Sequence, residues 1–228
     1  TSVNELDPWI YEPNYIAYEG RDNIKFQYVH NSGDDRRIDP SKSNIIDLYM
    51  LTEDYDISFR NWLLTQNGNE PLAPSSYELE SNYASVLEPI KTISDELIYH
   101  PVKYKTLFGS TANINLQAKF KAVKSSSSTL SNNEIISRIL EGINRFFSLE
   151  NWDFGQSFHF SELSTYIMNL MTPDITNFVI VPTINNFGSL YEVACQSNEI
   201  FISTATVNNV DIIQGISTET IRASGGVM

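Results

Sequence analysis

The chain has 228 residues, of which 41% are apolar, and a formal net charge of −13. This apolar content supports one large or two small domains, and twelve Tyr, twelve Phe and three Trp exclude intrinsic disorder over most of the length. The acidic charge argues against nucleic acid and against an anionic membrane surface as partners, because both select for Lys and Arg.

The single cysteine, Cys195, excludes an internal disulfide framework and fits a reducing compartment. It lies at the end of the run 191–195, which reads as a strand, and a small buried hydrophobe is favoured there over a nucleophile. The sequence shows no signal peptide and no apolar run long enough for a membrane span. Because the chain opens with Thr1 in a stretch rich in Pro, Asn and Tyr, we expect it to be a piece of a longer polypeptide.

Residues 1–43 are broken by proline and glycine, and they predict an extended arm with one short strand at 24–29. Residues 44–52 are apolar on both faces, which is typical of a central, covered strand. Residues 53–65 carry apolar side chains at helical spacing and predict a short helix. A second helix is predicted over 82–97, with a kink or a break at Pro89.

A strand follows at 102–108, and a strictly alternating strand is predicted at 114–123. Its inward side chains are expected to be Ile114, Leu116, Ala118, Phe120 and Ala122. The polar link 125–129 then leads to Ser131, which forms a capping box with Glu134 at the start of an amphipathic helix. The buried stripe of that helix is expected to contain Ile135, Ile136, Ile139, Leu140, Ile143, Phe146 and Phe147.

A further amphipathic helix is expected to begin with Ser161 as its cap and to end at Pro173. Its apolar stripe is Leu163, Tyr166, Ile167, Leu170 and Met171. A short buried strand is predicted at 177–181, and three strand-like runs follow at 190–195, 199–206 and 208–213.

Strands and helices alternate in blocks, which predicts an α+β fold. We expect a mixed β-sheet with helices packed on one face, an α/β sandwich, preceded by an irregular arm and followed by a β-rich C-terminal tail. The expected regions are the arm at 1–43, the sandwich core at 44–185 and the tail at 186–228.

The residues that could carry chemistry do not form a recognisable site. His30, His100 and His159 share no metal-ligand spacing, and the pair His159 and Glu162 has no third ligand nearby. The run 155–159 narrowly fails the nucleophile-elbow pattern, and the run 109–111 lacks the lysine of a phosphate loop. Glu53, Asp54 and Asp56 follow a strand, but acids favourable to a helix N-terminus explain them better than an active site does. The sequence therefore predicts no catalytic residue, no metal site and no cofactor.

Three sets of stretches resemble a known family. They are residues 37–41 (RIDPS) leading into 44–52 (NIIDLYMLT), residues 99–105 (YHPVKYK) with 116–121 (LQAKFK), and residues 198–203 (NEIFIS). They are similar to the C-terminal portion of inner-ring baseplate wedge proteins of T4-type contractile-tailed bacteriophages, in the baseplate J-like family. The likeness covers most of the chain beyond residues 1–20, and the pattern of elements over 114–181 also matches.

The resemblance implies a structural subunit of the tail baseplate, without catalysis or cofactor. It implies a homodimer within each wedge, contacts with other wedge proteins, and wedges joined in a ring around the central hub. Such a protein is assembled in the host bacterial cytoplasm, resides in the virion, and helps to transmit the rearrangement that accompanies sheath contraction.

Two hypotheses for an interface follow from the residues. The arm carries large apolar and aromatic side chains that cannot form a local core, and the tail offers strand edges to a partner. The candidate interface residues are Trp9, Tyr11, Tyr15, Tyr18, Tyr191 and Phe201. A carbohydrate-active enzyme and a host-receptor adhesion module remain alternative functions.

Overall fold

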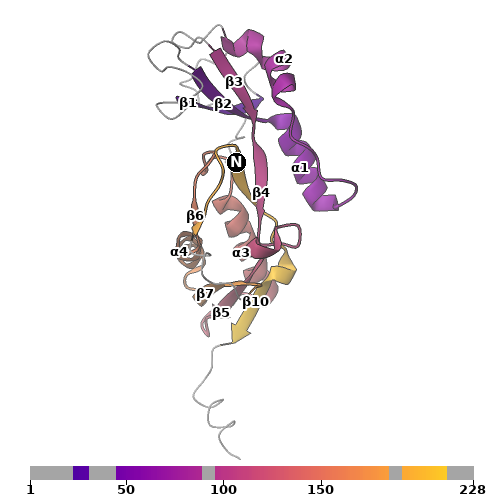
Figure 1. Cartoon of the computed structure of the whole chain (residues 1–228). Coiled ribbons are helices and arrows are strands. Elements are labelled where there is room, and N and C mark those ends of the chain that lie inside the picture. The colour runs from indigo at the N-terminus through magenta and orange to yellow at the C-terminus, as the bar shows by residue number, and fades with distance from the viewer. Residues whose placement is uncertain (1–22, 31–44, 89–95, 185–191, 215–228) are drawn as a thin grey trace, which may run out of the picture. The chain divides into compact units, whose positions relative to one another are not determined.

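A computed structural model describes residues 23–30, 45–88, 96–184 and 192–214, and these residues form an α+β fold (Figure 1). The predicted fold class is confirmed. The chain divides into two units. The first comprises Thr1–Tyr104, Trp152–Gln156 and Cys195–Ile200, and the second comprises Lys105–Asn151, Ser157–Ala194 and Phe201–Met228. The range 44–185, expected as one core, thus contributes to both units.

The first unit is built on a three-stranded sheet in the order β1-β2-β3. Strand β1 (Ile24–His30) pairs antiparallel with β2 (Ile45–Thr52), which pairs parallel with β3 (Glu96–Pro101). The expectation that β2 is central is confirmed, and Leu48, Met50 and Leu51 on it are fully buried. Burial on both faces explains why this strand reads as a continuous apolar run.

Helix α2 (Ser76–Leu87) covers one face of this sheet, and its Leu79 and Leu87 join a core with Leu48, Met50 and Tyr99. The prediction of a helix over 82–97 is wrong at both ends. The helix starts earlier because Ser75 and Glu78 form a capping box, in which the Ser75 N–H donates to Glu78 at 2.7 Å. Leu97 instead lies in β3, where it is paired with Ile46.

Helix α1 (Glu53–Thr65) begins directly after β2 and has the predicted bounds. Tyr55 and Phe59 are its buried apolar residues, and Trp62 and Leu63 are half-buried. The helix ends at Gln66, which adopts a left-handed conformation with φ of 50°. This is a common way to end a helix, because it turns the chain away from the helix axis.

The second unit contains a sheet in the order β10-β5-β7. Strand β5 (Ala118–Lys124) pairs antiparallel with β7 (Ile175–Pro182) and parallel with β10 (Val210–Gln214). Helices α3 (Asn132–Phe146) and α4 (Phe160–Met171) lie on one face of it (Figure 1). The expected tail therefore supplies β10, which is an integral strand of this sheet.

The start of β5 differs from the prediction. Residues Ile114–Leu116 form a 3-10 turn, and the strand begins only at Ala118. The Asn113 side chain accepts a hydrogen bond from the Asn115 N–H at 3.0 Å, which stabilises the turn. Ile114, expected to point inward, is 59% exposed, whereas Ala118, Phe120 and Ala122 are buried as predicted.

The two helices of the second unit begin in different ways. The capping box of α3 is confirmed: the Ser131 N–H donates to Glu134 at 2.7 Å, and the Glu134 N–H donates to Ser131 at 3.2 Å. The prediction that Ser161 caps α4 is wrong, because the helix begins at Phe160 after His159 without a side-chain cap. Both helices bury a stripe of apolar residues, namely Ile135, Ile139, Ile143, Leu163, Ile167 and Met171.

Four short strands complete the described structure. Strand β4 (Lys103–Leu107) pairs with β9 (Glu199–Ser203), and β6 (Phe158–His159) pairs with β8 (Glu192–Val193). Aromatic rings fill the core of the second unit with centroid separations of 4.9–6.2 Å, among them Phe108, Phe120, Phe147, Phe158, Phe160 and Phe201. Rings in tilted and edge-to-face contact bury large apolar areas at specific geometry.

Candidate functional site

The acidic cluster at the start of α1 separates into surface acids and one buried acid. Asp54 is exposed, but Asp56 is only 4% exposed and lies among aromatic rings. Arg60 donates from Nε to Asp56 Oδ1 at 2.6 Å, and the Tyr104 hydroxyl donates to the same oxygen. The Arg60 guanidinium lies 5.8 Å from the centroid of the Tyr104 ring.

Burial governs the electrostatics of this cluster. It raises the pKa of Tyr104 well above 10, and the neighbouring Asp56 carboxylate raises it further. Burial likewise raises the pKa of Tyr55 to about 12. Both hydroxyls are therefore neutral donors at physiological pH. The buried Asp56 accepts hydrogen bonds from Arg60 and Tyr104 within the first unit, so the cluster fastens α1 to the start of β4 rather than offering a site for a ligand.

A second polar group lies on the face of the first sheet opposite α2. His100 Nε2 lies 2.7 Å from Asp47 Oδ1, and the imidazole stacks on Tyr49 with ring centroids 5.0 Å apart. Tyr49 and His100 are register partners on β2 and β3, which explains why the two rings stack. On β1, Lys25 donates to the Trp152 carbonyl at 2.6 Å and lies over the Phe154 ring.

The remaining residues singled out for chemistry are dispersed. His159 Nδ1 lies 3.6 Å from Glu162 Oε1 at the surface, and Cys195 is half-buried outside the short strand β8. Among the residues that the structure describes, no group of three or more His, Cys, Asp or Glu side chains could hold a metal ion. Over the same residues, no helix is long and apolar enough to cross a membrane.

The candidate site for binding another protein is the second sheet, on the face opposite α3 and α4. Alternation along the three strands places on this open sheet face the side chains of Lys119, Lys121, Val123, Asn177, Val179, Val181, Asp211 and Ile213. Val179 is 46% exposed and Ile213 is 40% exposed. Lys119 and Asp211 form an exposed ion pair across two strands at 3.9 Å. Apolar side chains framed by charged ones are typical of a surface that packs against another protein.

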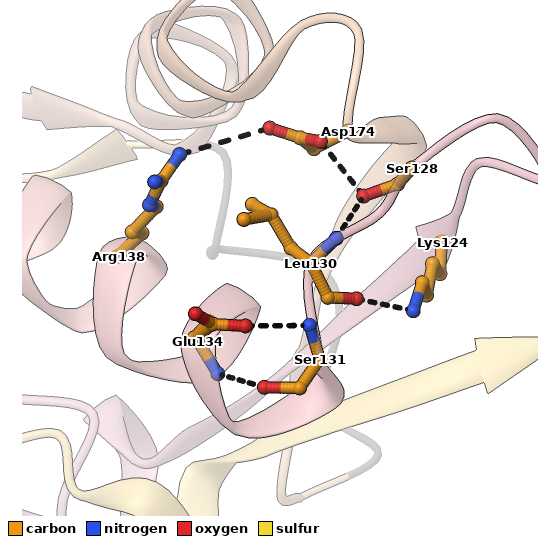
Figure 2. A network of polar contacts seen from close by, with 7 residues as sticks. All are labelled: Lys124, Ser128, Leu130, Ser131, Glu134, Arg138 and Asp174. Carbon is orange, nitrogen blue, oxygen red and sulfur yellow. Dashed lines mark hydrogen bonds and ion pairs between the residues drawn. The ribbon is translucent and has the colours of Figure 1, made fainter.

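A polar network holds the strand β7 of this sheet in place, as Figure 2 shows. Asp174, the residue before β7, accepts a hydrogen bond from the Ser128 hydroxyl at 2.7 Å. Its other carboxylate oxygen lies 3.8 Å from Arg138 on α3, and its backbone carbonyl accepts from the Ser125 N–H at 2.9 Å. The serine-rich link 125–129, expected only as a polar linker, thus binds the start of β7 to α3.

The same link is fastened to β5. Lys124 donates to the Leu130 carbonyl, and the Leu130 N–H donates to the Ser128 hydroxyl at 3.3 Å (Figure 2). The capping box of Ser131 and Glu134 follows immediately. This continuous set of bonds fixes the position of β7 relative to α3 and β5, and so fixes the shape of the open sheet face.

The structure describes one of the six residues expected at an interface. Trp9, Tyr11, Tyr15, Tyr18 and Tyr191 fall outside the described residues. Phe201 is 1% exposed, and its ring packs against Phe147 and Phe158. Its side chain therefore belongs to the core of the second unit, which corrects the expectation of an interface role.

Sequence reasoning also missed the residues that build the open sheet face as a set. The alternation over 118–123 revealed that Lys119 and Lys121 share one outward face. The strands on either side of β5 come from residues 175–182 and 210–214, and such distant pairing leaves no signal in spacing. No family model matches the sequence, and no curated protein sequence matches it.

Proposed function

We propose that this chain is a structural subunit of the tail baseplate wedge of a contractile-tailed bacteriophage. It self-associates, contacts other wedge proteins, and joins wedges into a ring around the central hub, so its place is the virion. The resemblance to baseplate J-like wedge proteins supports this proposal. Those of its stretches that the structure describes fall largely on β2, on β3 and β4, on β5 and on β9.

The structural observation that supports the proposal best is the open sheet face of the second unit. Exposed valine and isoleucine side chains lie there beside Lys119 and Lys121, on a sheet whose other face is already covered by helices. A ring-forming subunit must offer surfaces of this kind to its neighbours, because apolar contact provides affinity and charged residues provide specificity.

The proposal is tested by the solution mass of the chain over a concentration series, measured by light scattering. A mass of twice 25.9 kDa or more is expected, since the proposed subunit associates with itself. A mass that stays at 25.9 kDa up to high concentration contradicts self-association. Binding to a glycan array by such a monomer favours the adhesion alternative instead.

A second measurement addresses location. Antibodies raised against the chain are applied to negatively stained particles of the phage that encodes it. Gold label at the baseplate is expected. Label at the fibre tips, where receptors are bound, contradicts the wedge assignment and supports the adhesion module.

A further inference from the structure

Strand β7 lies at the edge of its sheet and exposes a row of backbone groups. It pairs with β5 on one side, and no described strand pairs with its other side. The Thr183 N–H donates to the Gln117 carbonyl at 2.9 Å, which shows that the odd-numbered residues of this segment bond to β5. Because such bonds alternate along a regular antiparallel strand, the N–H and C=O groups of Phe178 and Ile180 point away from β5.

Beyond Thr176, this edge lacks the features that protect natural sheet edges from pairing. The eight residues Ile175–Pro182 (ITNFVIVP) carry no charged side chain, and their only proline is the last residue. The register with β5 is regular from Ala118 to Val123, and the single irregularity falls between Val123 and Lys124. Charges, internal prolines and bulges are the usual protection, so residues 177–182, which follow the irregularity, form a regular and unprotected template for another strand.

The charge of the chain limits where a second copy can be added. A second copy of a chain with net charge −13 is repelled by most of the surface of the first. The β7 edge is a site where two copies meet without placing like charges opposite each other, because the strand carries none. An antiparallel arrangement also lets the outward amides and carbonyls of one copy bond to those of the other about a two-fold axis.

We infer that β7 pairs antiparallel with β7 of a second copy of this chain, which joins the two sheets into one. The two-fold axis that relates the two copies passes near Val179. The Val179 side chain then contacts Val179 of the second copy on the open sheet face. The network centred on Asp174 holds the strand ready for pairing, because it fixes the residue that precedes Ile175. This inference rests on the self-association in the proposed function and specifies the surface that produces it.

The test uses a lysine on each edge of the sheet. Val179→Lys places a positive charge beside the axis, so the two copies repel and the mass by sedimentation equilibrium is expected to fall from twice 25.9 kDa to 25.9 kDa. Ile213→Lys is the matched control on the opposite edge strand β10, where the native side chain is similarly exposed, and it is expected to remain dimeric. Circular dichroism checks that both variants keep the native fold.

Charge rescue separates strand pairing from a general effect of the substitution. Val179→Lys and Val179→Glu are each expected to be monomeric, and an equimolar mixture is expected to recover the dimer because opposite charges meet at the axis. Amide hydrogen exchange gives an independent readout. The outward amides of Phe178 and Ile180 are expected to be protected in the wild-type dimer and to lose that protection in Val179→Lys.

The outcomes distinguish this inference from the proposed function. If the wild-type chain and Val179→Lys are both dimers, or if the Phe178 and Ile180 amides exchange rapidly in the wild-type dimer, the β7 inference is overturned while self-association stands. If the wild-type chain is a monomer at every concentration, the inference and the self-association both fail.

Discussion

Asp174 accepts a hydrogen bond from the Ser128 hydroxyl at 2.7 Å, across 46 positions of sequence. Ser128 lies in the link that enters α3, and Asp174 lies at the entry to β7. The bond therefore couples the geometry of a helix start to that of a strand start within the second unit.

Removing the Asp174 carboxylate is expected to loosen both the link 125–129 and the start of β7. Asp174→Ala should lower the free energy of unfolding by about 1–3 kcal/mol, since it removes the carboxylate that accepts from the half-buried Ser128 hydroxyl and lies beside Arg138. Ser128→Ala should cost about 1 kcal/mol, and the double variant less than the sum, because the two residues share one interaction. Urea unfolding measures all three, with exposed Glu141→Ala as a control expected to change little.

A close backbone approach leaves no room for a side chain at Gly109 in the second unit. A Cβ atom at this residue would lie 1.9 Å from the Thr204 carbonyl oxygen, which is a backbone atom and cannot rotate away. Gly109→Ala is therefore expected to cost more than about 3 kcal/mol or to prevent folding. Thermal unfolding followed by circular dichroism measures the loss.

Gly68→Ala provides the matched control for that substitution. Gly68 has a φ of +81°, but no atom lies within 4 Å of its Cβ position. Only the cost of the left-handed backbone applies there, which is about 1 kcal/mol. Equal losses at the two positions would show that the approach of Thr204 is not what constrains Gly109.

Local signals in the sequence predicted the elements whose stability is local. The periodicity of residues 53–65 gave α1 its bounds, and the capping box of Ser131 and Glu134 gave α3 its start. The same logic misassigned Leu97, whose spacing from Val86 and Ile90 is helical by coincidence. Its place in β3 depends on parallel pairing with β2, some 50 residues earlier, and pairing at that distance has no periodicity to detect.

The candidate sites also combine features that local sequence signals reveal with features that depend on contacts between distant residues. An acidic cluster at 53–56 was visible in the sequence, but nothing distinguished Asp56 from its neighbours. What sets Asp56 apart is Tyr104, 48 positions later, and burial that only the folded chain creates. Likewise, the alternation of β5 revealed one outward face, but the strands that extend this face, β7 and β10, could be identified only in three dimensions.

The capping box of α3 is expected to make stability depend on pH. Hydrogen bonds from the backbone and side chain of Ser131 lower the pKa of Glu134 below 4.5 in the folded state. A carboxyl group with a depressed pKa in the folded state stabilises the protein above the pKa of the unfolded state, and this contribution is lost as the pH falls through the folded-state pKa.

Glu134→Gln tests this dependence because it removes the charge and keeps the shape. The variant is expected to have a lower urea midpoint than the wild type at pH 7, and the difference is expected to shrink below pH 4. A difference that stays constant from pH 7 to pH 3 would indicate that the charge of Glu134 contributes nothing. Glu141→Gln, at an exposed position of the same helix, is the matched control.

Tyr104 is expected to make the first unit sensitive to alkali. Burial raises the pKa of its hydroxyl well above 10, whereas in the unfolded chain the hydroxyl titrates near 10. The folded state therefore holds a proton that the unfolded state releases above pH 10. Stability is fully present below pH 10 and falls as the pH rises from there, because the unfolded state gains by ionising.

Tyr104→Phe removes this titration together with the hydrogen bond to Asp56. At pH 7 the variant should be less stable by about 1–3 kcal/mol, because the buried carboxylate loses a donor. Above pH 10 its stability should fall less steeply than that of the wild type, and urea midpoints from pH 7 to pH 11.5 measure both effects. Tyr77→Phe is the control, since Tyr77 is 77% exposed. Parallel declines in Tyr104→Phe and the wild type would show that the Tyr104 hydroxyl does not govern the alkaline limit.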